Sequence, residues 1–185
     1  VRELVQSGAL GKIMRFTGTY DQDQLLDESL PVTWRHINKL AGCGALGDLG
    51  SHLLSISQFI MGDISKVNAM STIVFPKRPK AAGSSEMADV ENEDIMTFMA
   101  EYANGAIGTI ACSRVATGRK NYLCYEIQGT KGSVRYDLER MGEVQVYFQS
   151  DNERDRGFRT VLLNPQMKGY SAFQTAGGIS IAYND

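Results

Sequence analysis

The chain has few of the residues that build metal centres or disulfide frameworks. Its 185 residues include only three cysteines and two histidines. Cys43, Cys112 and Cys124 are an odd number without a CxxC pair, which favours reduced thiols in a cytoplasmic protein over a disulfide framework. No cluster of histidine and cysteine includes His36 or His52, so the sequence suggests no metal site.

Long apolar runs and concentrated charge are also lacking. No window approaches the roughly 18 continuous apolar residues that a membrane-spanning helix needs. The formal net charge is −2 and no basic run is present, which argues against a role at nucleic acid or at a membrane surface. Because the patterns at Val1 and Asp185 are cut short, we expect residues 1–185 to be one domain and a piece of a longer chain.

Hydrophobic periodicity predicts one long helix. Leu49, Leu53, Ile56 and Ile60 recur at i, i+4, i+7 and i+11, which is one apolar stripe of a helix that Gly62 ends. A shorter helical pattern stands at residues 2–7. No other helix is predicted.

Alternating patterns and turn signals predict about seven or eight strands. Residues 103–105 (Ala-Asn-Gly) and 130–132 (Thr-Lys-Gly) are hairpin turns. Residues 21–31 and 77–89 are predicted to be loops, and residues 164–185 carry no clear pattern. The fold class is therefore α+β, a largely antiparallel open sheet with a helix packed on one face. The predicted strands are residues 12–20, 64–75, 94–102, 106–114, 123–129, 133–137, 143–149 and 158–163.

No second long helix is available to cover the other face of this sheet. A half-apolar outer face is a candidate subunit interface, and we expect a homo-oligomer that forms through it. The alternative is an amphipathic face that is simply wetted.

Asp48 and His52 are the candidate catalytic residues. They stand four residues apart on the predicted helix, where their side chains meet on one face. A carboxylate can orient an imidazole and prepare it for general acid/base work. The same spacing is also typical of a surface ion pair. Gly42, Gly44 and Gly47, just before the helix, allow a ligand or another backbone to approach closely.

Three further positions carry charge or a large aromatic side chain. Trp34 is typical of a core or interface anchor, and Arg35 is either a surface charge or an anion-binding fork. Arg114 and Lys120 are surface charges by default, with a reach into a pocket or an interface as the alternative.

Six segments of the chain carry motifs that together are specific for one family. They are residues 7–13, 34–35, 41–52, 59–64, 93–94 and 126–133. Through them the chain resembles the C-terminal domain of the glucose–fructose oxidoreductase and inositol dehydrogenase (Gfo/Idh/MocA) family. The resemblance covers about the first 140 residues in order and is looser beyond them. It departs from the family pattern at Cys43, which stands where the middle of three glycines is usual.

The resemblance implies the C-terminal half of a two-domain oxidoreductase. A Rossmann domain, absent from this chain, would bind NAD or NADP, and this domain would bind a sugar or polyol substrate. Asp48 and His52 match the Asp-x-x-x-His catalytic pair of the family, and Trp34 and Arg35 match a pair near the nicotinamide. The competing hypothesis is a sheet-mediated assembly or sensing module that has kept the fold without catalysis.

Overall fold

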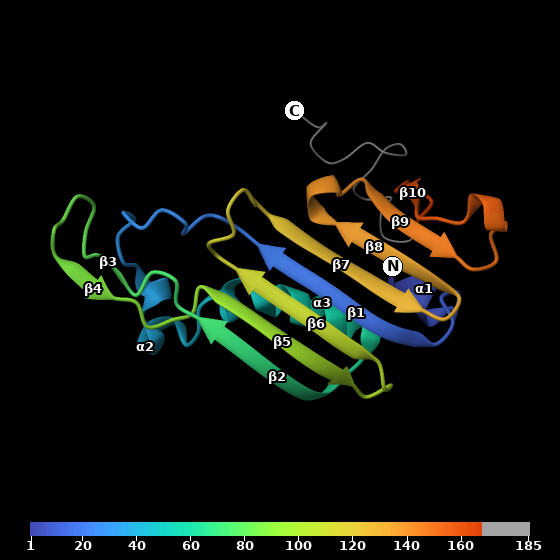
Figure 1. Ribbon diagram of the computed structural model, residues 1–185, viewed down its shortest axis with the longest axis horizontal. Helices are drawn as coiled ribbons and strands as arrows, with labels where there is room; N and C mark the ends of the chain where they lie inside the picture. Colours follow the sequence, from blue (N-terminus) through green and yellow to red (C-terminus); the bar gives the residue numbers. More distant parts are fainter. Residues whose placement is uncertain (168–185) are drawn as a thin grey trace. The chain divides into compact units, whose positions relative to one another are not determined.

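The computed structural model describes residues 1–167 and contains an eight-stranded sheet. The strands hydrogen-bond in the order β10-β9-β8-β7-β1-β6-β5-β2 (Figure 1). Residue contacts divide the chain into two compact units. The first contains residues 1–15 and the chain from Cys124 onward, and the second contains Phe16–Leu123. Strands β1 (Ile13–Asp21) and β7 (Tyr122–Gly129) contribute residues to both units.

The first unit contains a helix and an antiparallel meander. Helix α1 is Arg2–Gln6, and the chain turns after it at Gly8, which has φ +75°. The meander consists of β7 (Tyr122–Gly129), β8 (Gly132–Asp137), β9 (Glu143–Phe148) and β10 (Arg159–Leu162). Each strand pairs antiparallel with the next. Short 3₁₀ turns are Leu138–Arg140 and Glu153–Asp155.

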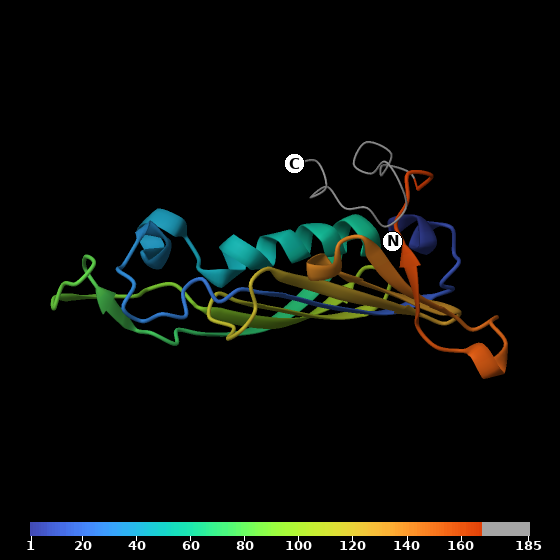
Figure 2. The ribbon, with the colours of Figure 1, turned by 90° about the horizontal axis from the view of Figure 1, so that it is seen from above.

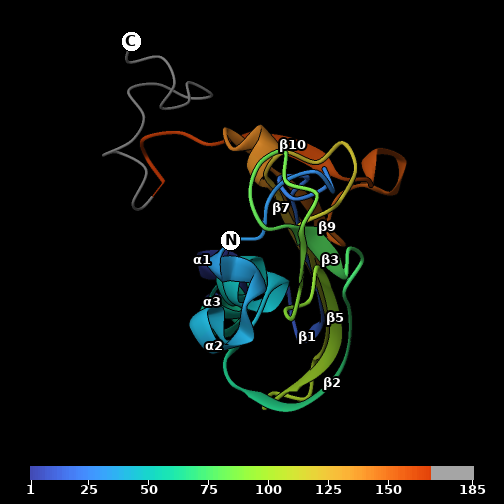
Figure 3. The same cartoon turned by 90° about the vertical axis from the view of Figure 1, so that its left-hand side faces the viewer.

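The second unit packs the long helix on its strands. The strands are most of β1, then β2 (Ile64–Thr72), β5 (Ile95–Tyr102) and β6 (Ile107–Ser113). Helix α3 (Ser51–Met61) lies along one face of them (Figure 2). Viewed from the end, α2 (Asn38–Ala41) and α3 lie on the same side of β1, β5 and β2 (Figure 3).

Alternation along the strands explains which face the helix covers. Phe16 of β1 and Tyr102 of β5 point to α3 and are almost fully buried, and their rings meet edge to face at 6.4 Å. Gly18 leaves room for the side chain of Leu53, since a Cβ there would lie 3.1 Å from Leu53 Cδ2. Burial also raises the pKa of the Cys112 thiol, on the same face, to about 12.

The predicted fold class is confirmed. The printed pairings β2–β5 and β5–β6 are antiparallel, whereas β1 and β6 run in the same direction (Figure 1), so the sheet is mixed. Gly105, with φ +82°, makes the predicted turn between β5 and β6. Gly62, with φ +92°, ends α3 as predicted. The prediction for residues 164–185 lies mostly outside the described residues.

Three local predictions are wrong. Residues 77–89 are not a loop but a hairpin of β3 (Lys77–Pro79) and β4 (Met87–Asp89), which extends away from α3 (Figure 1). The hairpin is held because Arg78 is fully buried and donates to the carbonyl oxygens of Leu25 and Asp27. The 3₁₀ turn Trp34–His36 and helix α2 were not predicted, because neither is long enough to show a period.

The third error concerns the start of the long helix. Leu46–Gly50 is a π-helical segment that leads into α3, not the first turn of an α-helix. Gly47 and Gly50 lower the cost of such a widened turn because they carry no side chain to crowd it. Among residues 1–167, no helix has the length and hydropathy to cross a bilayer.

Candidate functional site

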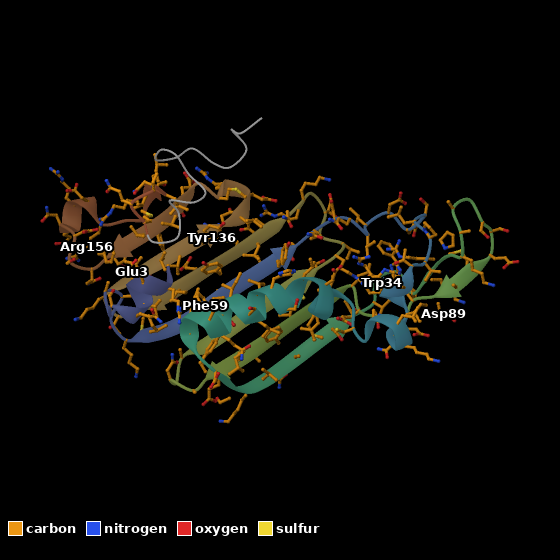
Figure 4. All side chains as sticks on the ribbon, turned by 180° about the vertical axis from the view of Figure 1, so that it is seen from behind. Glu3, Trp34, Phe59, Asp89, Tyr136 and Arg156 are labelled. Atoms are coloured by element: carbon orange, nitrogen blue, oxygen red, sulfur yellow. The ribbon has the colours of Figure 1, made fainter. Side chains whose placement is uncertain are left out.

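The 3₁₀ turn Trp34–His36 directs its first two side chains outward and its third inward. The backbone N–H of Thr33 donates to His36 Nδ1 at 2.9 Å, and His36 is fully buried. Trp34 remains 53% exposed, and the guanidinium carbon of Arg35 lies 4.5 Å from the Trp34 ring centroid. Figure 4 shows Trp34 beyond the N-terminal end of α3, with Phe59 near the opposite end of that helix. The inward histidine therefore fixes an outward-facing indole and guanidinium.

Asp48 faces this turn. Its carboxylate oxygen Oδ2 lies 3.6 Å from Nε of Arg35, and both side chains are about half exposed. The backbone N–H of Asp48 donates to the carbonyl of Gly44 at 3.1 Å, which joins the π-helical stretch to the glycine segment before it. The ion pair thus joins two segments that the sequence analysis treated separately.

His52 lies on the first turn of α3 with its ring against Tyr20. The two ring centroids are 5.7 Å apart with an interplanar angle of 73°. The Tyr20 hydroxyl donates to Asn121 Oδ1 at 2.7 Å, and Gln22 Nε2 donates to the same oxygen at 2.8 Å. His52 itself is exposed. An exposed imidazole beside a phenol ring can exchange a proton with a hydroxyl placed against it.

The expected direct pairing of the two catalytic candidates is not observed. Among residues 1–167, no hydrogen bond or ion pair joins Asp48 to His52, and Asp48 pairs with Arg35 instead. A π-helical turn holds more than the 3.6 residues of an α-helical turn, so the i, i+4 rule does not apply across Leu46–Gly50. The assignment of catalytic roles to Asp48 and His52 remains a prediction.

Arg114 is not a surface charge. It is 2% exposed, and its NH2 lies 3.1 Å from Oδ1 of Asp94, which is fully buried. NH1 of Arg114 donates to the carbonyl of Arg35 at 3.4 Å. Lys120 is a surface charge as predicted, because it is exposed and pairs with Asp23 at 2.7 Å. Sequence reasoning missed Arg114 because its partners lie 20 and 79 residues away.

The buried charges under the Trp34–His36 turn affect its histidine. Burial lowers the pKa of His36, and the positive charges of Arg114 and Arg78 lower it further. His36 is therefore a neutral structural residue rather than an acid/base group near pH 7. Because Nδ1 accepts the hydrogen bond from Thr33, the ring proton resides on Nε2.

A separate cavity of about 110 Å³ lies in the first unit. It contains none of the predicted site residues. Its lining is mostly charged and includes an ion pair between Arg140 and Glu143. The lining residues are Arg135, Asp137, Arg140, Glu143, Val144 and Gln145.

Comparison with known proteins places this geometry in context. The family model described as the GFO/IDH/MocA C-terminal domain matches residues 1–135. Levoglucosan dehydrogenase of Pseudarthrobacter phenanthrenivorans is 39% identical over 175 residues, which cover 89% of this chain and 45% of that protein.

Two solved structures are similar in fold as well. One is a levoglucosan dehydrogenase in complex with NADH and levoglucosan, with a TM-score of 0.84 and 39% identity, covering 89% of this chain and 43% of that one. The other is an NAD binding oxidoreductase from Klebsiella pneumoniae, with a TM-score of 0.90 and 38% identity, covering 96% and 47% of the two chains. The chain therefore spans about half the length of these relatives.

Proposed function

This chain belongs to the GFO/IDH/MocA C-terminal domain family, and from this premise we propose that the full-length protein is an NAD(P)-dependent oxidoreductase acting on a sugar or polyol. Residues 1–185 serve as its substrate-binding and oligomerisation domain. The observation that carries the proposal is the exposed His52 imidazole next to Tyr20, with the Arg35–Asp48 ion pair on the neighbouring segment. The similar levoglucosan dehydrogenase structure is a complex with NADH and levoglucosan.

The residues of this chain supply the proton chemistry of the reaction. In the direction of oxidation, the substrate hydroxyl gives its proton to His52 Nε2 or Nδ1 while its carbon becomes a carbonyl. The chemistry that a bound nicotinamide cofactor would supply is the acceptance of the hydride from this carbon. Asp48 binds or orients the substrate beside the imidazole. In the direction of reduction, His52 returns the proton to the carbonyl oxygen.

Trp34 and Arg35 are the residues of this chain that suit a nicotinamide cofactor. An exposed indole face can pack against a flat ring, and a guanidinium can donate to a phosphate or carboxamide oxygen. The phosphate-binding glycine loop is not in this sequence, so most of the cofactor contacts belong to the rest of the protein.

The proposed activity is tested by assaying the full-length protein with NAD and NADP against a panel of sugars and polyols. Reduced nicotinamide that accumulates with one of these substrates is the expected result. A full-length protein that binds no nicotinamide in calorimetry would instead support the non-catalytic assembly module.

Replacing Arg35 with methionine tests the cofactor contact. We expect the KM for the oxidised cofactor to rise about tenfold with a smaller change in kcat, because a charged donor is lost while the aliphatic stem remains. Lys39→Met is the matched control, since Lys39 is an exposed base on the neighbouring helix α2. An unchanged KM for the cofactor in the Arg35 variant would rule out the contact.

The sheet face of the second unit that α3 does not cover is the proposed interface between two copies of the chain. It carries Met99, Met70 and Ile107, which are 61%, 80% and 61% exposed. In the strand register Met70 pairs with Thr97, and Ile107 pairs with Glu101. Thr97, Met99 and Glu101 are alternate residues of β5, so Met70, Met99 and Ile107 lie on the same face of the sheet. An apolar surface of this kind is typical of a subunit contact.

Met99→Lys tests that interface. A buried charge at the centre of an apolar contact is costly, so light scattering should show a shift from the oligomer to a smaller species. Met87→Lys is the control, because Met87 is 46% exposed but lies on the β3–β4 hairpin. A monomeric wild type, or an equal effect of both substitutions, would exclude this face.

The free cysteines support a cytoplasmic location. Cys43, Cys112 and Cys124 are all free thiols, and a reducing cytoplasm keeps thiols in this state. We propose the cytoplasm as the site of action. Mass analysis of the alkylated protein from cell extract should show all three as thiols.

A further inference from the structure

The glycine segment before Asp48 is held by one side chain. The Glu93 carboxylate accepts hydrogen bonds from the backbone N–H groups of Gly44 and Leu46, each at 2.9 Å. The backbone of Glu93 adds a third contact, because its carbonyl accepts from the N–H of Ala45 at 2.9 Å. A Cβ at Gly44 would overlap this carbonyl oxygen, so only glycine allows the two backbones to approach. Of the three glycines that the sequence offered for a close approach, Gly44 therefore admits a backbone.

The contact with Glu93 leads directly to the candidate catalytic carboxylate. Gly44 donates to Glu93 through its N–H and accepts from the N–H of Asp48 through its carbonyl, at 3.1 Å. Asp48 in turn pairs with Arg35 at 3.6 Å. Gly44 alone thus connects Glu93 to a residue of the exposed ion pair. Leu46, which Glu93 also binds, is the first residue of the π-helical segment.

The residues on either side of Glu93 in the sequence also make buried contacts. Asn92 is 1% exposed, and its Nδ2 donates to the carbonyl of Arg35 at 2.9 Å. Asp94 is fully buried, accepts from the backbone N–H of Val74 at 2.8 Å, and pairs with Arg114. Three consecutive residues, Asn92 to Asp94, therefore fix both the backbone that carries Arg35 and the backbone that carries Asp48.

We propose that Glu93 is a positioning residue, whose carboxylate sets the π-helical segment and so places Asp48 against Arg35 and His52 beside the substrate. Its role in turnover rests on the proposed function, whereas its hold on the segment does not. A carboxylate suits this place because it accepts from two N–H groups at once and its negative charge lies at the start of the helix. The side chain does not touch the reacting atoms.

Kinetics of the full-length protein test the role in turnover. Glu93→Ala should lower kcat by about 10- to 100-fold, because a misplacement of about 1 Å is enough for such a loss, and leave the KM for the cofactor within about twofold. Glu93→Gln should recover part of the loss, because its Oε1 can still accept from both Gly44 and Leu46, while its amide nitrogen replaces the Oε2 that also accepts from Gly44 at 2.9 Å. A Gln variant as impaired as the Ala variant would overturn the assignment.

Glu91→Ala is the matched control. The Glu91 carboxylate is two residues earlier, is exposed, and accepts from the backbone N–H of Asn38 at 2.7 Å. It therefore makes the same kind of contact with another helix, but not with the segment that carries Asp48. We expect a kcat within about twofold of the wild type. An equal loss of kcat in the Glu91 and Glu93 variants would mean that the loss of any carboxylate bound to a backbone N–H lowers turnover. This result would overturn the proposal.

Amide hydrogen exchange tests, without any assay of activity, whether Glu93 holds the segment that carries Asp48. In the full-length protein, Glu93→Ala should increase exchange in the peptide that contains Gly44 to Asp48, and Glu93→Gln should increase it less. Unchanged exchange in the Ala variant would overturn the proposal. If the wild type proves inactive, the proposed function fails, and the exchange result still shows whether Glu93 holds the segment.

Discussion

Replacing His52 with glutamine in the full-length protein should lower kcat by about 10²- to 10⁴-fold, the loss expected for a positioned acid/base. Glutamine keeps the polarity and much of the reach of the side chain but cannot exchange a proton near neutral pH. His52 is exposed, so its replacement removes no buried contact except the ring contact with Tyr20. The measurement is steady-state turnover with saturating cofactor and the best substrate of the panel.

Gln58→Ala provides the control on the same helix. Gln58 is an exposed residue of α3 and comes well after Asp48 and His52 in the sequence. Its replacement should leave kcat within about twofold. If the His52 variant turns over at a rate near that of the wild type across the whole panel, another group must move the proton.

The largest loss of stability is expected from Asp94→Ala. This change leaves the guanidinium of Arg114 buried without its carboxylate, and the backbone N–H groups of Val74 and Phe75 lose their acceptor. Breaking a buried ion pair from one side costs about 3–5 kcal/mol of unfolding free energy. The measurement is urea-induced unfolding, in which the midpoint should fall without a change in slope.

Asp89→Ala is the comparison for a surface pair. Asp89 lies 3.3 Å from Lys77, and both side chains are more than 60% exposed, so its loss should cost less than about 1 kcal/mol. Figure 4 shows Asp89 on the β3–β4 hairpin. An Asp94 variant as stable as the Asp89 variant would show that Arg114 finds water or another partner when Asp94 is gone.

The residues behind the two predictions differ in how clearly the sequence pointed to them. His52 stood out by its position after the glycines and by the resemblance to a family pattern. Asp94 was noted only as part of a two-residue motif, and its partner Arg114 was assigned to the surface. A charged side chain is usually exposed, and nothing within a few residues of Arg114 offers it a carboxylate.

Local patterns were sufficient where the structure depends on near neighbours. The apolar stripe from Leu49 to Ile60 predicted α3, because residues three and four apart share a helix face. The Ala-Asn-Gly turn predicted the hairpin of β5 and β6, because glycine adopts positive φ at low cost. The spacing of apolar residues carries no signal for a widened turn, so the π-helical start of the helix was not predicted.

The sequence by itself determined the strands of the eight-stranded sheet, the long helix and the family to which the chain belongs, since each is encoded in short periods or in motifs read in order. Only the tertiary structure decided that Asp48 pairs with Arg35, that Glu93 binds the glycine segment 49 residues earlier, and that Arg114 is buried. These outcomes depend on partners distant in the chain. The desolvation of a buried charge is offset only when folding brings such partners within hydrogen-bond distance.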